Sequence, residues 1–351
     1  MKQLPVVGAL AMCGASGALL SALHSPLPWM IGPLLAMAVA KFLGVHVAAP
    51  RGGRAAGQLT IACALGLYFT PVVAGEVAAH WYLLVGAALL AVLLAYASGW
   101  FLMRFGGLDA TTALFSSVPG GAAEMTILGE RFGARAERVV LAQALRVFIV
   151  VLVVPFGFTA LGLHGADPYR PAQSAVDGLG LLALLGAAAT VGGVLAKLRI
   201  PNAWMLGPLG ATVALTLAGV NLSAVPTWLS NTAQLLIGCA LGSGFDRESL
   251  KSSHRFIGLV CASVALAMMA SALLAWGLAL MGSVPPPTMV LATAPGGMAE
   301  MCVTAKVLQL GVPLVTAAHV TRVIILVTTT APTFRLAKRF RRVLRGAQGV
   351  E

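Results

Sequence analysis

The sequence predicts an all-helical protein that crosses a lipid bilayer many times. Of its 351 residues, 59% are hydrophobic and 10% are charged, whereas about a quarter of an average soluble domain is charged. The mean hydropathy is +0.92. A soluble domain needs a largely polar surface, and a disordered chain is poor in apolar residues. The composition therefore excludes a soluble enzyme and a disordered protein.

Apolar stretches long enough to span a bilayer recur along the whole chain. They predict helices at residues 4–23, 28–44, 55–73, 81–103, 139–158, 176–197, 201–220, 229–245, 256–281 and 313–333. Because no convincing cleavage site follows the first stretch, we expect it to be a retained helix. The five cysteines lie in apolar stretches without a Cys-x-x-Cys pair, so we expect neither disulfides nor a metal site.

Two further apolar segments, 110–128 and 286–304, are interrupted at their centres by Pro-Gly-Gly. The polar stretch 159–175 separates the chain into a first half, 1–158, and a second half, 176–334. A basic tail, 335–351, follows the last apolar stretch. We expect this tail to be a cytoplasmic anchor, with lipid or nucleic-acid binding as the alternative.

The two halves contain the same motifs in the same order. Trp-Met-x-Gly-Pro-Leu begins at Trp29 and again at Trp204. Three later motifs recur with one offset of 176 residues. They are Gln-Leu-x-Ile-x-Cys-Ala-Leu-Gly at Gln58 and Gln234, Pro-Gly-Gly-x-Ala-Glu-Met at Pro119 and Pro295, and Arg-Val at Arg146 and Arg322. Chance similarity between apolar helices would not match Trp, Gln, Pro, Glu and Arg in order, so the sequence predicts a duplicated fold.

The distribution of basic residues distinguishes two topologies. If both Pro-Gly-Gly segments cross the membrane, the halves are parallel and many basic residues fall outside: Arg131, Arg135, Arg138, Lys197, Arg199, Arg247, Lys251, Arg255 and Lys306. If both segments are re-entrant, the second half is inverted and only Arg170 and Lys306 fall outside. Basic residues favour cytoplasmic loops.

We therefore expect two inverted repeats with about ten crossings and two re-entrant or broken hairpins. Both termini then lie in the cytoplasm of a bacterial inner membrane. Residues 130–138, 246–255 and 335–351 face the same side.

The Pro-Gly-Gly tips are candidate parts of a binding site. Inverted repeats with interrupted helices are typical of secondary transporters, whose site lies at the repeat interface. Proline lacks a donor and glycine is conformationally permissive, so each tip frees backbone groups for a ligand. The alternative is a proline kink that allows close packing. The candidate tip residues are Pro119, Gly120, Gly121, Pro295, Gly296 and Gly297.

Glu124 and Glu300 are the only acids set within apolar sequence. An ionisable residue inside a membrane is costly and is by default a functional candidate. Arg146 and Arg322 are the expected partners of these carboxylates. The alternative is a pair of static Glu–Arg bridges that lock each hairpin to a helix.

Other polar residues offer weaker signals. Gln58 and Gln234 either offer an amide to a ligand or cap the free backbone of a hairpin. Trp29 and Trp204 are expected to be interfacial anchors, or else a wall of the solute path. His319 replaces Gln143 in the second half, one helical turn before Arg322, and we expect it to be a packing residue.

The doubled motifs resemble those of the AbrB/AmoA-type membrane protein family, over residues 4–334. Labels used in that family imply a transcriptional regulator or an ammonia monooxygenase, and the family supplies no established catalytic residues. A copper monooxygenase needs clustered histidines, but the six histidines here never fall within one helical turn of one another. No soluble DNA-binding domain exists outside the spans, so we expect any regulatory effect to be indirect.

These observations favour a secondary transporter of a small organic solute, coupled to protons or sodium ions. The alternative is a membrane-embedded sensor that affects gene expression through a partner, and an integral-membrane oxidoreductase ranks third. We expect no cofactor and no direct nucleic-acid contact. The solute, the coupling ion, the bilayer and a second copy of the chain are the partners to consider.

Overall fold

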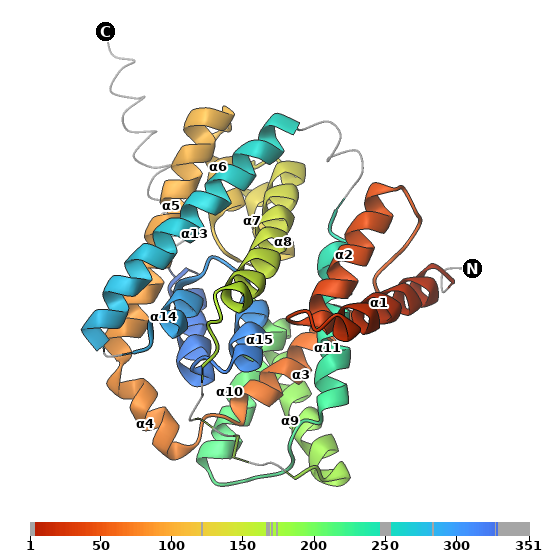
Figure 1. The fold of residues 1–351 in the computed structure, drawn as a ribbon, viewed down its shortest axis with the longest axis vertical. Coiled ribbons are helices and arrows are strands. Elements are labelled where there is room, and N and C mark those ends of the chain that lie inside the picture. The colour runs from red at the N-terminus through yellow and green to blue at the C-terminus, as the bar shows by residue number, and fades with distance from the viewer. Residues whose placement is uncertain are drawn as a thin grey trace.

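The computed structural model describes residues 4–120, 122–165, 169, 171–172, 175–245, 254–282, 284–326 and 328. The regular secondary structure of these residues is helical, without strands (Figure 1). The helices are α1 (Leu4–Ala22), α2 (Pro28–Phe42), α3 (Gly53–Gly66), α4 (Pro71–Ala79), α5 (Trp81–Gly106), α6 (Ala110–Ser117), α7 (Ala122–Arg131), α8 (Ala136–Ala160), α9 (Gly178–Lys197), α10 (Ala203–Leu217), α11 (Thr227–Gly242), α13 (His254–Gly282), α14 (Pro286–Thr293), α15 (Met298–Leu308) and Val312–Leu326.

Among the described residues, α5, α8, α9 and α13 are long and apolar enough to cross a membrane. The bent pair α3–α4 qualifies as a fifth span if it is counted as one unit. Shorter apolar helices include α2, α10 and Val312–Leu326. The chain is therefore a membrane-type helical protein, while the number of ten crossings stays a prediction. The basic tail 335–351 and most of the loop 246–255 lie outside the described residues.

The predicted helix at 55–73 is wrong at its end. α3 stops at Gly66, and α4 starts at Pro71 with a bend of 92° between the two axes. Thr70 adopts an extended conformation, and its side chain accepts a hydrogen bond from the Val73 amide. A capping threonine followed by proline is a local start signal for a new helix, and it outweighs the continuous hydrophobicity.

The described helices other than α4 form two groups, which we name the first bundle and the second bundle. The first bundle contains α1, α2, α3, α9, α10 and α11, which pack on one another. The second bundle contains α5, α6, α7, α8, α13, α14 and α15, together with Val312–Leu326, whose side chains bind the end of α14. α3 contacts α15, and both α2 and α11 contact α8, so these helices join the two bundles.

Equivalent residues of the two halves make equivalent contacts. α1 and α2 cross so closely that a Cβ atom at Gly32 would lie 2.7 Å from the backbone nitrogen of Gly17. α9 and α10 cross in the same way, since a Cβ at Gly207 would lie 2.6 Å from the Cα of Gly192. Glycine is required at these crossings because any side chain would separate the backbones.

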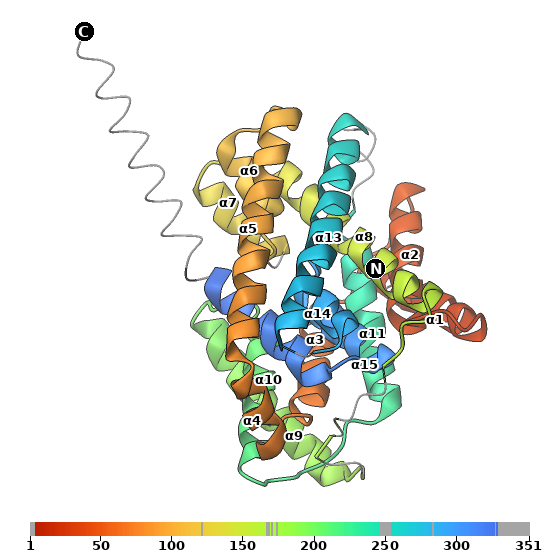
Figure 2. The ribbon, with the colours of Figure 1, turned by 60° about the vertical axis from the view of Figure 1, so that its left-hand side comes forward.

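The central pair of the second bundle, α5 and α13, runs antiparallel. Leu83 lies at Gly282, and Gly86 lies at Leu278, whereas Gly106 lies near Leu259 at the other end of the pair. α6 packs on the C-terminal half of α5, and α14 packs on the C-terminal half of α13. The two interrupted segments therefore lie toward opposite ends of this pair, as both views show (Figures 1 and 2).

We predict that Gly207→Ala destabilises the protein, whereas Gly210→Ala on the same helix does not. A Cβ at Gly207 would overlap the backbone of α9, and overpacking of this kind costs about 1–3 kcal/mol. A Cβ at Gly210 meets nothing within 4 Å. The measurement is thermal unfolding of each purified variant in detergent. Equal melting temperatures for the two variants would contradict the close α9–α10 crossing.

Candidate functional site

Both interrupted segments break where the sequence predicts. Val118 and Ala294 each precede a proline, and both adopt extended ψ angles, 124° and 137°. Proline excludes the helical conformation at the residue before it, so α6 ends at Ser117 and α14 ends at Thr293. The helical chain resumes as α7 and α15. Of the predicted tip residues, Gly121 lies outside the described residues.

The first glycine of each tip makes room for a methionine. A Cβ at Gly120 would lie 2.7 Å from Cγ of Met125, and a Cβ at Gly296 would lie 2.8 Å from Cγ of Met301. Both methionines are buried. The recurrence of Glu-Met after Pro-Gly-Gly therefore includes a packing requirement, because the methionine covers the tip.

The last carbonyl groups of α6 are bound by two side chains of α8. Gln143 Nε2 donates to the carbonyl oxygens of Phe115, at 2.8 Å, and Val118, at 2.9 Å. The Arg146 guanidinium donates to the carbonyl oxygens of Ser117 and Val118 and to Oε1 of Gln143. These bonds satisfy backbone groups that the Pro-Gly-Gly break leaves without helical partners.

The end of α14 is bound in the same way by the helix Val312–Leu326. Arg322 donates through Nη1 to the carbonyl of Ala294 and through Nη2 to that of Gly296, each at 2.8 Å. His319 Nε2 lies 3.0 Å from the carbonyl of Leu291. His319 is fully buried and thus has a defined role in binding the broken helix.

The acidic residue of the second tip does not form the expected salt bridge with a described arginine side chain. Glu300 is 2% exposed, and its carboxylate folds back against Gly297 at the start of α15. A Cβ at Gly297 would lie 2.8 Å from its carboxyl carbon. Among the described side chains, no salt bridge joins Glu300 to Arg146 or Arg322, whose Nη atoms bind carbonyl groups instead. Glu124 belongs to α7, but its side chain lies outside the described part.

A cavity of about 90 Å³ lies between the two bundles and brings many of the candidate residues together. A space of this size holds several water molecules. From the second bundle it is lined by Pro119, Gly120, Gly296, Gly297, Glu300, Arg146 and Arg322. From the first bundle it is lined by Gln58, by the start of α10 and by the end of α11.

Three of the other residues singled out lie elsewhere. Gln234, the equivalent of Gln58, is 7% exposed and does not line this cavity. Trp29 and Trp204 pack over Gly17 and Gly192 of the preceding helices, so both serve the crossings within the first bundle.

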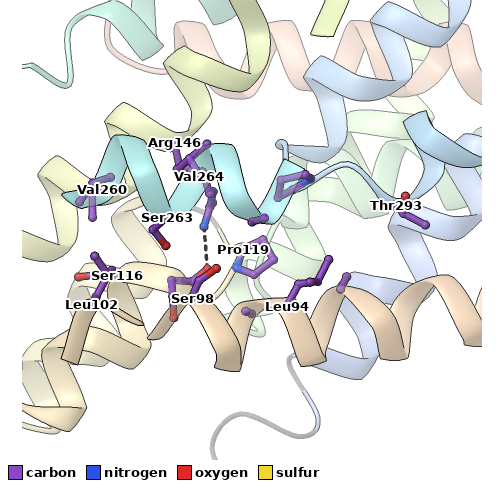
Figure 3. Close-up of a pocket in the computed structure, with 16 residues that line it drawn as sticks. Leu94, Ser98, Leu102, Ser116, Pro119, Arg146, Val260, Ser263, Val264 and Thr293 are labelled. Carbon is purple, nitrogen blue, oxygen red and sulfur yellow. Dashed lines mark hydrogen bonds between the residues drawn. The ribbon is translucent and has the colours of Figure 1, made fainter. Parts of the chain in front are cut away.

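A smaller cavity of about 30 Å³ lies on the other side of Arg146. It is bounded by α5 and α13, and hydroxyl groups line it from Ser98, Ser116, Ser263 and Thr293 (Figure 3). Pro295 also lines this smaller cavity. The dashed line in Figure 3 marks the bond from Arg146 to the carbonyl of Ser117. Arg146 and Pro119 line both cavities and thus form part of the partition between them.

Three polar residues that line the larger cavity were not among the candidate site residues: Arg54, Gln143 and Asn202. Asn202 precedes α10 with a φ of 54°, a left-handed conformation that asparagine tolerates. Its equivalent in the first half, Leu27, has a φ of 48°. The replacement of Leu27 by a polar residue, Asn202, in the second half is the sequence feature that could have indicated this position.

Basic side chains outnumber acidic ones around the larger cavity. Arg54, Arg146 and Arg322 line it, against one described acid, Glu300. The Nε atoms of both Arg146 and Arg322 are buried without a hydrogen-bond partner among the described atoms. Buried donors of charged groups are costly when they are unpaired. The arrangement is therefore suited to an anionic group, or to water that such a group displaces.

Comparison with known proteins gives one family. The model of the family described as "Transition state regulatory protein AbrB" matches residues 29–338. An Escherichia coli (strain K12) protein named "Putative regulator AbrB" is 29% identical over 290 residues, which cover 81% of this chain and 82% of that protein. A Bacillus subtilis (strain 168) protein named "Uncharacterized protein YhjN" is 28% identical over 362 residues, covering 93% and 91%.

We predict that Arg322→Gln lowers the stability of the protein, because a glutamine on this helix cannot reach both Ala294 and Gly296. Each carbonyl left unsatisfied in an apolar interior costs about 1–3 kcal/mol. Thermal unfolding in detergent measures the loss. The matched control is Arg131→Gln, which removes an exposed arginine at the end of α7. An Arg322→Gln protein as stable as the control would contradict a role in holding the tip.

Proposed function

The chain belongs to this AbrB family, and we propose that it is an inner-membrane secondary transporter of a small anionic organic solute, coupled to protons or sodium ions. The observation that carries the proposal is the cavity between the bundles. Two interrupted helices end there, and the two buried arginines that line it each have an Nε atom without a hydrogen-bond partner among the described atoms. Interrupted helices at a repeat interface are the usual site of secondary transporters.

We infer that the two halves are inverted, with ten crossings and two re-entrant hairpins. The antiparallel packing of α5 and α13 supports this arrangement, since equivalent helices of inverted repeats run in opposite directions. The position of the two tips toward opposite ends of that pair supports it as well. The distribution of basic residues in the sequence supports a cytoplasmic position for both termini.

The two halves contribute unequally to the larger cavity, and this difference supports an alternating-access mechanism. The larger cavity reaches the starts of α3 and α10 and the end of α11, through Arg54, Asn202 and Gly244. In the proposed topology all three lie on the cytoplasmic side. The equivalent surface of the other half includes Gln234, which is buried. In the proposed topology the larger cavity is therefore directed toward the cytoplasm. Movement between the bundles would open the opposite side.

Glu300 provides a route for coupling to protons. Its carboxylate occupies the start of α15, where the free amides and the helix dipole favour negative charge. A solute carboxylate would compete for the same helix end and for the same arginines. Exchange of the coupling ion at Glu300 would thereby be linked to the entry of the solute.

A second function is supported by the printed name of the E. coli relative, which describes a regulator. A membrane sensor would bind the same anion in the same cavity and act on a partner. The two functions differ in one measurable property. A transporter moves solute across a liposome membrane in the absence of any other protein, whereas a sensor binds solute without moving it.

We predict that Glu300→Gln abolishes gradient-driven uptake while the protein stays folded. A screen of acetate, pyruvate, succinate and citrate by thermal shift selects the anion, because a ligand stabilises the state that binds it. Uptake of that anion into proteoliposomes is then driven by an imposed pH gradient. The variant should fall to the level of empty liposomes, because the glutamine cannot exchange a proton.

The control is Glu130→Gln, which removes an exposed acid of α7. The melting temperature of Glu300→Gln should stay close to that of the unmodified protein, since the arginines keep their carbonyl partners. Uptake at the normal rate by Glu300→Gln would overturn the assigned role of Glu300. Binding without uptake by the unmodified protein would favour the sensor.

We predict that a cysteine at position 135 is labelled from the cytoplasmic side. Arg135 is exposed at the start of α8. Four native cysteines are buried and Cys261 is half-buried, so background labelling should be low. A membrane-impermeant maleimide should react in inside-out vesicles and not in intact spheroplasts. Labelling in intact spheroplasts and not in inside-out vesicles would instead favour parallel halves, in which both Pro-Gly-Gly segments cross the membrane.

A further inference from the structure

A separate hollow of about 500 Å³ lies where α5 ends and where α8 and α13 begin. Five basic side chains line it, and no acidic side chain is among its lining residues. The basic residues are Arg104, Arg135, Arg138, His254 and Arg255. None of them lines either of the two cavities described above. We name this feature the basic hollow.

Packing contacts hold two of these guanidinium groups in place. Arg138 lies over the ring of Phe256, with 4.7 Å between its Cζ and the ring centroid. Arg104 lies over Phe105 at 5.8 Å. The Arg135 amide donates to Thr112 Oγ1 at 2.9 Å and ties the start of α8 to α6. Stacked guanidiniums lose less freedom when they bind a ligand, because they are already oriented.

The described acids near the basic hollow compensate its charge only in part. Asp109 caps α6, where its carboxylate accepts from the Thr112 amide at 2.9 Å, and it also attracts Arg135. Glu137 is exposed on α8 and does not line the hollow. Four arginines gathered in one concave surface repel one another, and a counter-anion relieves that cost.

The charge and donor geometry select the class of anion. A monocarboxylate carries one charge and would leave most of the arginines uncompensated. A phosphate group carries up to two charges on three acceptor oxygens. The planar fork of arginine matches this geometry with paired hydrogen bonds.

We propose that the basic hollow is a binding site for a phosphate group, carried either by a lipid headgroup or by a soluble phosphate compound. α5, α8 and α13 are long enough to span the bilayer, and the end of α5 meets the starts of α8 and α13 here, so we infer that the hollow lies at the level of the membrane surface. Arg138 precedes Arg146 by eight residues on α8, about 12 Å along the axis. A phosphate bound here would thus anchor the helix that holds the first tip, whichever solute the chain transports.

The test uses the full-length protein and the double variant Arg138→Gln/Arg255→Gln. In the first arm, both proteins are placed in phosphatidylcholine nanodiscs and titrated with inorganic pyrophosphate, with thermal unfolding as the readout. In the second arm, phosphatidylglycerol replaces a rising fraction of the phosphatidylcholine without added pyrophosphate. Arg131→Gln/Lys197→Gln is the matched control, since it removes the same charge from residues outside the hollow.

Stabilisation of the unmodified protein in the first arm, with affinity at least tenfold weaker in the double variant, identifies a soluble phosphate compound as the source. The same pattern confined to the second arm identifies the lipid headgroup. The control pair should behave like the unmodified protein in either case. If the double variant and the control respond equally in both arms, the effect is general surface charge and the proposal is overturned. Failure of solute uptake does not affect this result, because neither arm measures transport.

Discussion

The structure depends on how the ends of two broken helices are satisfied inside an apolar environment. Each Pro-Gly-Gly tip interrupts a helix and frees carbonyl groups that bilayer lipid cannot hydrogen-bond. Gln143 and Arg146 bind the end of α6, and His319 and Arg322 bind the end of α14. The recurrence of arginine at 146 and 322 is explained in part by these carbonyl groups, which both guanidiniums bind. A guanidinium offers several donors in a fixed plane, so one side chain can satisfy two carbonyls.

The two arginines that bind the helix ends also contribute positive charge to the larger cavity. Arg146 and Arg322 use Nη atoms to bind backbone carbonyls, and their Nε atoms have no partner among the described atoms. Since both arginines line the space between the bundles, the requirement that stabilises the tips also leaves a positive site. One pair of side chains thus links the stability of the tips to the proposed function. In the proposed mechanism Glu300 acts beside these arginines and is not their hydrogen-bond partner.

Much of the fold could be predicted from the sequence, because long apolar stretches and proline act locally. The helix positions, the break in each Pro-Gly-Gly segment and the matching of the halves agree with the described helices. The bend after α3 was missed because hydrophobicity continues through Thr70 and Pro71. Charge pairing predicts Glu124 and Glu300 as partners of the arginines, and for Glu124 this stays a prediction because its side chain lies outside the described part. The carbonyl groups that bind the guanidiniums could not be predicted, because they become visible only when the helix ends are placed in space.

The differences between equivalent positions show what each half requires. Arg146 and Arg322 are identical, because both tips need two carbonyls bound. Gln143 and His319 differ, yet each binds the equivalent carbonyl of Phe115 or Leu291, so this position requires only a side-chain donor. Leu27 and Asn202 share a left-handed turn, but only Asn202 lines the cavity. The duplication therefore preserves the chemistry of the tips and varies the walls between the bundles, so that only one of the two equivalent surfaces is polar at this position.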